Sequence, residues 1–199
     1  MARVNEIRYV GYGVTNIEAE KKFYTDAWQL IEVPSDDGMI YLAAPGSSAA
    51  YSVRLRPSAE PRIDVISWSA ADRSEVDALA QQVEQAGGKI ISQPHEMSEL
   101  GGGYGFRFFD LIGFTIEVCT GFETRIADTI QPGEPRPEQI SHVVLHAPNP
   151  QEYVEFYEKA LGFRVSDWLG DFMCFLRCNE WHHRLAILPG PPAFTHVAY

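Results

Sequence analysis

The fold of this chain is decided by residues 139–168, QISHVVLHAPNPQEYVEFYEKALGFRVSDW. Gln139–His146 is an apolar, β-branched run typical of a buried strand, and Gln151–Leu161 carries apolar residues at helical spacing. Three more strands are predicted after this helix, near Phe163–Trp168, Phe172–Arg177 and His183–Leu188. The order of elements is therefore strand, helix and three strands, or βαβββ.

The same order occurs twice upstream. In the first unit, a strand at Ile7–Val14 precedes a helix capped by Asn16, and three short strands follow. Four residues of this first helix repeat at helical spacing and predict its buried stripe: Ala19, Phe23, Ala27 and Leu30. The second unit opens with a strand at Arg62–Trp68, and the stripe of its helix is Val76, Leu79 and Val83. We expect an α+β protein made of tandem βαβββ modules.

Sliding the third unit onto the first without gaps tests the repeat. The matches fall on the strand and the buried side of the helix, for example Val143 on Val10 and Asn149 on Asn16. In this register Tyr9 stands opposite His142. In the second unit, Asp64 lies roughly opposite His196. The first two units therefore lack these imidazoles.

A shift in composition marks the predicted domain boundary. Residues 123–138 are rich in proline and polar side chains, which is typical of a linker. We expect a paired module without metal at residues 1–122 and a metal-binding module at residues 139–199. A fourth unit opens at Phe194 and is soon cut off, so the C-terminal module is expected to be truncated.

Composition and charge exclude several classes of function. The 199 residues have a net charge of −11 and no basic run, which argues against nucleic-acid binding. No apolar run approaches the length of a membrane span, and the N-terminus lacks a signal sequence, so we expect a cytoplasmic protein and no membrane partner. Three cysteines without CxxC spacing are expected to be reduced core residues: Cys119, Cys174 and Cys178.

The histidines indicate metal chemistry. Five of the six histidines fall between residues 139 and 199: His142, His146, His182, His183 and His196. One imidazole from each of two neighbouring strands can converge on one ion, so His142 and His196 are the candidate metal ligands. Two neutral imidazoles leave the charge of a metal uncompensated, and a carboxylate should complete the set. The counterpart of Glu117 in the last strand of the second unit would supply it, and we expect that glutamate beyond Tyr199.

The repeated units, with the motifs HVVL, FYEKALGFRVSD, HHRLA and THVAY, resemble the type I extradiol ring-cleaving dioxygenases of the vicinal oxygen chelate superfamily. The likeness covers the whole chain as a fold and is specific from about Ile140 onward. It implies an Fe(II) centre, with Mn(II) as an alternative, held by two histidines and one glutamate. His142 and His196 match the ligands, and His183 matches the catalytic acid/base, a role for which His182 competes.

The resemblance implies O2-dependent cleavage of a catechol-type ring next to its diol, in a homo-oligomer. Phe172, Phe175 and His182 are expected to line the pocket for the substrate. One alternative is a non-catalytic protein of the same fold that binds an aromatic ligand, as bleomycin-resistance modules do. Another is a metal isomerase or lyase of the glyoxalase type, which would act without O2.

Overall fold

The computed structural model describes residues 1–199 as three βαβββ units and a final strand. The first unit contains β1 (Glu6–Val14), α1 (Ile17–Asp26), β2 (Ile31–Val33), β3 (Ile40–Ala43) and β4 (Val53–Pro57). The second contains β5 (Arg62–Ser69), α2 (Arg73–Ala86), β6 (Lys89–Glu96), β7 (Tyr104–Phe109) and β8 (Thr115–Thr120). The third contains β9 (His142–Ala147), α3 (Pro150–Leu161), β10 (Arg164–Leu169), β11 (Met173–Arg177) and β12 (Leu185–Pro189), and β13 (Ala193–Ala198) follows.

The strands form two sheets. The first two units share an eight-stranded sheet of order β2-β3-β4-β1-β5-β8-β7-β6, and the third unit with β13 forms a five-stranded sheet of order β10-β11-β12-β9-β13. In every unit the first strand pairs with the last in parallel, while the sheet continues through an antiparallel partner, β5 beside β1 and β13 beside β9. The predicted α+β fold of repeated βαβββ modules is confirmed.

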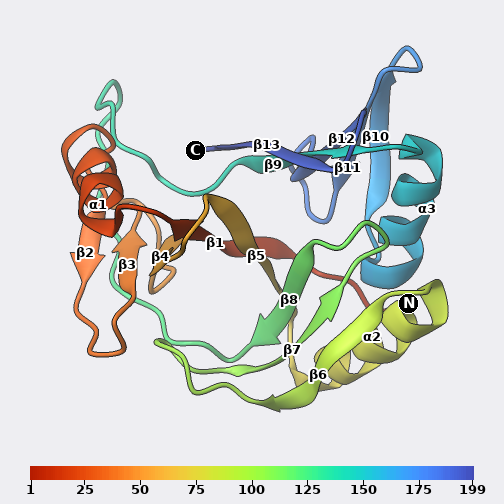
Figure 1. Ribbon diagram of the computed structural model, residues 1–199, viewed down its shortest axis with the longest axis horizontal. Coiled ribbons are helices and arrows are strands. Elements are labelled where there is room, and N and C mark those ends of the chain that lie inside the picture. The colour runs from red at the N-terminus through yellow and green to blue at the C-terminus, as the bar shows by residue number, and fades with distance from the viewer.

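The main core lies between the two sheets. Figure 1 shows α2 and α3 side by side, joining the second and third units. Thirty buried residues from both sheets and both helices form one cluster here, including Trp68, Phe108 and Phe156. The predicted stripe of α2, Val76, Leu79 and Val83, is buried in it. All three cysteines are buried and free, as expected.

The predicted stripe of α1 is wrong at Ala19, Phe23 and Ala27, which are exposed, and right only at Leu30, which is buried beyond the end of the helix. No residue of α1 is buried, and Phe23 is 51% exposed. The side of the helix that packs carries Ile17 and Tyr24, which, with Trp28, cover a small cluster of six buried residues. Apolar residues occur at helical spacing on two sides of this helix, and the small sheet beneath it covers only one of them.

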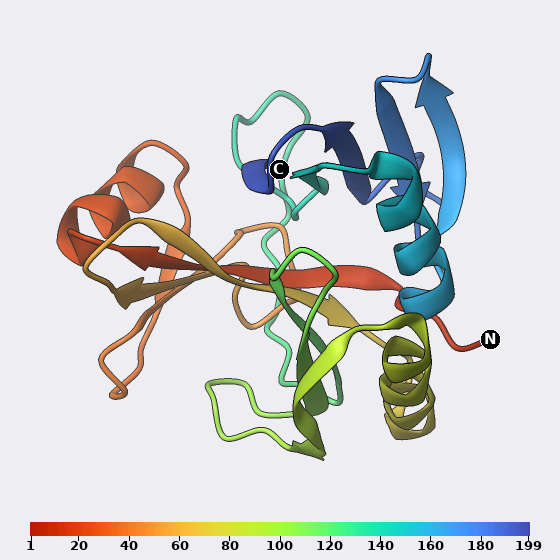
Figure 2. The ribbon, with the colours of Figure 1, turned by 45° about the vertical axis from the view of Figure 1, so that its right-hand side comes forward.

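Local sequence sets the ends of α3. The Asn149 side chain accepts from the Glu152 backbone N–H at the N-terminus, and Gly162 ends the helix with a φ of 70°. Glycine is required at this position twice over, because a Cβ would also lie 2.5 Å from the Cβ of Arg3. The N-terminal segment passes here, where the Val4 backbone N–H donates to the Leu161 carbonyl at 3.0 Å (Figure 2).

A buried polar contact also links the modules. Asp110, in the turn after β7, accepts hydrogen bonds from the hydroxyls of Tyr153 and Tyr157 on α3. Residues 121–141, which include the predicted linker, contain no helix and only an isolated bridge at Thr124. The domain boundaries and the truncation of the C-terminal module stay predictions.

No helix is long and apolar enough to span a bilayer.

Candidate functional site

Two candidate metal ligands meet on the five-stranded sheet. His142 begins β9, and His196 lies on the neighbouring β13. Their Nε2 atoms are 3.4 Å apart. The pairing of β13 with β9 shifts between Phe194 and His196, and this bulge places His196 opposite Val144, on the face that His142 also occupies. A regular strand would have turned His196 toward the other face.

The third histidine joins this pair. The ring centroids of His183 and His142 are 4.5 Å apart. Phe175 on β11 lies beside His183, with 4.9 Å between ring centroids, and 5.4 Å from the ring of His182. The Nδ1 atoms of His182 and His183 are 3.0 Å apart, so one ring donates a hydrogen bond to the other. Four of the predicted site residues therefore lie around His142.

One predicted pocket residue lies apart from this group. Phe172 is in the turn between β10 and β11, where it is 55% exposed, and its ring stacks on none of the histidines. His183 itself precedes β12, which begins at Leu185 rather than at the predicted position. His183 thus lies in the segment that precedes β12 and not on the strand itself.

Burial keeps the central imidazoles neutral. The pKa of His142 is lowered to about 4, mainly by burial and further by the neighbouring His183 and His196. Burial and the adjacent His182 also lower the pKa of His183. Neutral imidazole is the form that binds a metal ion or accepts a proton. Near neutral pH these side chains are ready for either task.

The geometry fits one shared metal ion, but the ligand set is incomplete. Imidazole nitrogens lie about 2.0–2.1 Å from a bound metal such as zinc, so two ligands of one ion are at most about 4.2 Å apart. The 3.4 Å separation of His142 and His196 satisfies this limit. No third His, Cys, Asp or Glu completes them into a group that could hold a metal. The chain therefore supplies two donors and no carboxylate.

The N-terminal sheet contains an equivalent of this site, and buried side chains fill it. Strand registers align four site residues, His142, Phe175, His183 and His196, with Tyr9, Tyr41, Tyr51 and Val65. These four counterparts form a buried cluster of their own. The expected match of Asp64 to His196 is wrong by one residue, because β5 has the same bulge as β13 and Asp64 is its unpaired residue.

A carboxylate is present in this filled site. Glu117 on β8 is fully buried and accepts from the Tyr9 hydroxyl at 3.2 Å and the Ser67 hydroxyl at 2.7 Å. Arg107 Nε donates to it at 2.8 Å, and Arg8 lies within 3.6 Å. The carboxylate of Glu117, which a metal would need as a ligand, is thus already bound by hydroxyl and arginine donors. Its position indicates where a third ligand would approach the His142 site, namely from a strand beside β13.

Sequence reasoning missed a buried arginine next to the site. Arg184 follows His183, is fully buried, and forms an ion pair with Glu6 of β1. It also donates to the Ser141 carbonyl at 2.7 Å, and burial lowers its pKa to about 10, so it stays charged. The signal was a charged residue at the start of an apolar strand in HHRLA. Arg184 fixes the segment that carries His183 to both modules.

Several known proteins are similar to this chain. The biphenyl-2,3-diol 1,2-dioxygenase of Paraburkholderia xenovorans is 24% identical over 94% of this chain and 67% of its own length. The manganese-dependent 2,3-dihydroxybiphenyl 1,2-dioxygenase of Geobacillus genomosp. 3 is 24% identical over 84% of this chain and 56% of its own. The crystal structure of the Mn(II)-bound glyoxalase from Novosphingobium aromaticivorans is 52% identical, with a TM-score of 0.97 over 100% of this chain and 66% of that one.

The chain thus spans about two thirds or less of the length of these relatives. The family model described as the Glyoxalase/Bleomycin resistance protein/Dioxygenase superfamily matches residues 6–118 and 139–196, which are most of the chain. The two matched ranges contain all three βαβββ units except the last two residues of β8, and the second contains the four histidines discussed above. The chain belongs to the glyoxalase/bleomycin resistance protein/dioxygenase superfamily.

Proposed function

We propose that this protein acts in the O2-dependent extradiol cleavage of a catechol-type aromatic at a non-haem Fe(II) or Mn(II) centre. The observation that carries the proposal is the convergence of His142, His196 and His183 beside the ring of Phe175. The curated relatives named above are ring-cleaving dioxygenases of aromatic diols, and one is manganese-dependent. These names support an aromatic diol as the substrate class.

Each side chain has a role in this proposal. His142 and His196 would hold the metal as neutral donors, and the bound ion would supply Lewis acidity toward the diol and O2. His183 would accept a proton from a substrate hydroxyl, which its lowered pKa suits, and could return it after ring opening. Phe175 would pack against the aromatic ring and keep water away from it.

The third ligand is the missing part of the centre. We infer that a carboxylate at the position equivalent to Glu117 would have to approach from a strand beside β13, because the described residues place no carboxylate there. Two imidazoles without a carboxylate bind a divalent metal weakly. Residues 1–199 alone are therefore expected to bind Mn(II) or Fe(II) weakly and to turn over slowly.

The test compares two proteins. One is this chain, and the other is this chain fused at its C-terminus to the part of the Novosphingobium protein that lies outside the similar region. Oxygen uptake and product absorbance are measured with Fe(II) or Mn(II) and a panel of catechols. We expect ring opening in the fusion, loss of metal binding in His142→Ala, and retained metal binding with lost turnover in His183→Gln. A metal-loaded fusion that consumes no O2 with any catechol would refute the proposal.

A second candidate is a metal isomerase or lyase of the glyoxalase type. The observation in its favour is the 52% identity to a protein described as a Mn(II)-bound glyoxalase. Such an enzyme needs the same imidazole ligands but neither O2 nor a redox-active metal. Turnover of a thiol conjugate of a ketoaldehyde under anaerobic conditions would favour this function over ring cleavage.

A further inference from the structure

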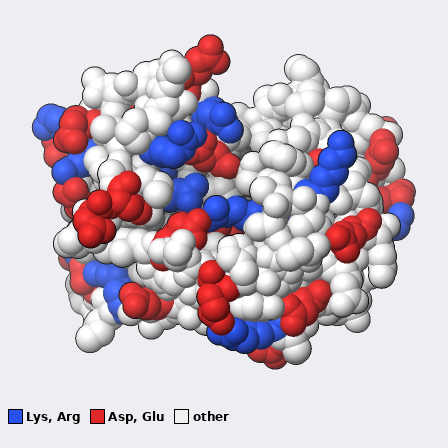
Figure 3. Space-filling view, turned by 60° about the horizontal axis from the view of Figure 1, so that its bottom comes forward, with Lys and Arg blue, Asp and Glu red and all other residues white.

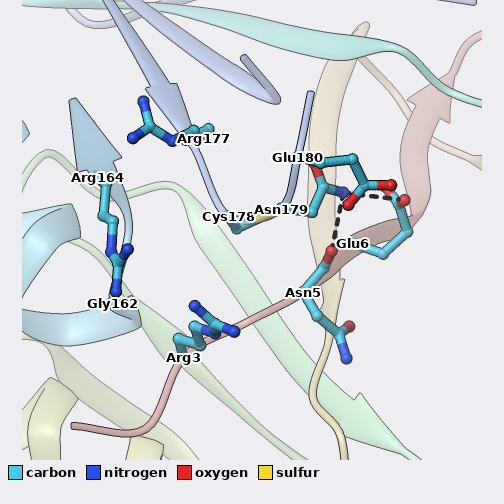
Figure 4. A pocket seen from close by; sticks show the side chains of 9 residues that line it. All are labelled: Arg3, Asn5, Glu6, Gly162, Arg164, Arg177, Cys178, Asn179 and Glu180. Carbon is cyan, nitrogen blue, oxygen red and sulfur yellow. Dashed lines mark hydrogen bonds between the residues drawn. The ribbon is translucent and has the colours of Figure 1, made fainter. Parts of the chain in front are cut away.

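A separate cavity of about 430 Å³ lies where the N-terminal segment meets the ends of β10 and β11 (Figure 4). Three arginines line it, Arg3 from the N-terminal segment, Arg164 from β10 and Arg177 from β11. In the close view their guanidinium groups stand around an open space on one side of the cavity, while Glu6 and Glu180 lie together on the other. Three cations from two modules thus share one cavity.

These arginines are unusual within this protein. Eight of the twelve arginines form ion pairs within 4.0 Å of a carboxylate. Figure 3 shows the common pattern, in which most basic side chains lie next to acidic ones. The four arginines without such a partner are Arg3, Arg54, Arg164 and Arg177, and three of these four line the cavity. Unpaired positive charge is therefore concentrated at one place.

The fold brings the three arginines to the same cavity. Arg177 donates to the Ser166 hydroxyl at 2.8 Å and to the Val165 carbonyl at 3.4 Å. Arg164 pairs directly with Arg177 across the antiparallel β10–β11 ladder. The backbone of Arg3 lies against Gly162, where a Cβ would be 2.5 Å from the Cβ of Arg3. Like charges placed opposite each other on paired strands are destabilising, so this arrangement lowers folding stability unless something compensates it.

Two carboxylates, Glu6 and Glu180, line the cavity itself. Glu6 pairs with Arg184 and also accepts from the Asn179 side chain at 3.3 Å. Glu180 has no ion pair and is the other carboxylate of the cavity. The planar guanidinium group presents paired N–H donors that match the oxygen atoms of phosphate and carboxylate groups. Although the chain has a net charge of −11, a basic cavity attracts an anionic ligand electrostatically.

We propose that the cavity between Arg3, Arg164 and Arg177 is a binding site for a small multivalent oxyanion, carried by a phosphate or a dicarboxylate. The ligand oxygens would accept from the three guanidinium groups and neutralise their mutual repulsion. Because the ligand touches the N-terminal segment and the third unit at once, its binding would also stabilise the contact between the two modules. This site is distinct from the histidine cluster and does not depend on the proposed reaction.

The experiment is a titration of the EDTA-treated chain with inorganic phosphate, and in parallel with malonate, at ionic strength held constant with NaCl. Calorimetry and the shift in Tm are recorded. We expect saturable binding of at least one of the two anions, and binding at least about tenfold weaker in Arg164→Gln and Arg177→Gln. Saturable binding of phosphate, of malonate or of both would support the site and would identify the class of its ligand.

Two control variants make the result specific. Arg73→Gln removes an exposed arginine outside the cavity, and His142→Ala removes the centre of the histidine cluster. Both are expected to bind the anion as the unchanged chain does. Arg164 is exposed and faces Arg177, so Arg164→Gln should fold and have a Tm in NaCl alone that is equal to or above that of the unchanged chain. The proposal is overturned if neither anion binds saturably, or if Arg164→Gln and Arg177→Gln bind it as tightly as Arg73→Gln.

Discussion

Glu117 is fully buried at the centre of the N-terminal sheet, and we predict that Glu117→Ala destabilises the protein strongly. The carboxylate accepts from Ser67, Tyr9 and Arg107, and it is the acidic partner of Arg8, whose side chain is 3% exposed. Removing it leaves these donors without an acceptor and leaves a buried guanidinium without its countercharge. The substitution therefore tests whether this filled site is held together by its polar network.

The expected magnitude follows from these contacts. Two hydrogen bonds from hydroxyls contribute about 1 kcal/mol each, and a charged one from Arg107 contributes about 1.5–3 kcal/mol. The sum agrees with the loss of about 3–5 kcal/mol that is typical when one partner of a buried ion pair is removed. Arg107 retains Glu99 at 2.5 Å, which limits the effect. We expect a loss near the middle of that range, and a Tm lower by about 10 °C.

The assay is urea denaturation followed by circular dichroism, with m-values compared between variants. Glu117→Gln keeps an amide oxygen for Ser67 and should lose about half as much. The matched control is Glu96→Gln, which removes the carboxylate of an ion pair with Arg73 whose side chains are 67% and 61% exposed, and it should change stability by less than about 1 kcal/mol. If Glu117→Ala were as stable as this control, the account of the network would be refuted.

Three further predictions concern single positions. Tyr153→Phe removes a buried hydrogen bond to Asp110 between the modules and should lower the free energy of unfolding by about 1–2 kcal/mol in urea denaturation. Gly162→Ala should lower the Tm measurably, because the φ of 70° is strained for alanine and its Cβ would lie 2.5 Å from that of Arg3. The pKa of His142 is lowered to about 4 in the folded chain, so the unfolded chain takes up this proton first as the pH falls. The free energy of unfolding should therefore be highest above about pH 6.5 and decrease as the pH falls from there toward 4. Solvent screening limits this loss to on the order of 1 kcal/mol, and it should disappear in His142→Phe when urea denaturation is compared at pH 7 and pH 4.

Periodicity predicted the order of elements because strands and helices leave different spacings of apolar residues. It found α2 with its buried stripe, and it found the repeat that relates Tyr9 to His142. It failed at α1, where the sequence offers apolar residues on two sides of the helix and the sheet covers only one. A pattern shows which sides of a helix can be buried, whereas the neighbouring layer decides which side is.

The sequence by itself determined that this protein is a repeat of βαβββ units, with one candidate imidazole ligand in the first strand of the third unit and another in the strand that follows this unit. Only the tertiary structure decided that these imidazoles meet, because a bulge before His196 changes the face on which it lies, and a bulge has no periodic signature. The arginine cavity is also a tertiary result. Arg3 and Arg177 are far apart in sequence, and the packing of the N-terminal segment against α3 and β11 alone brings their charges together.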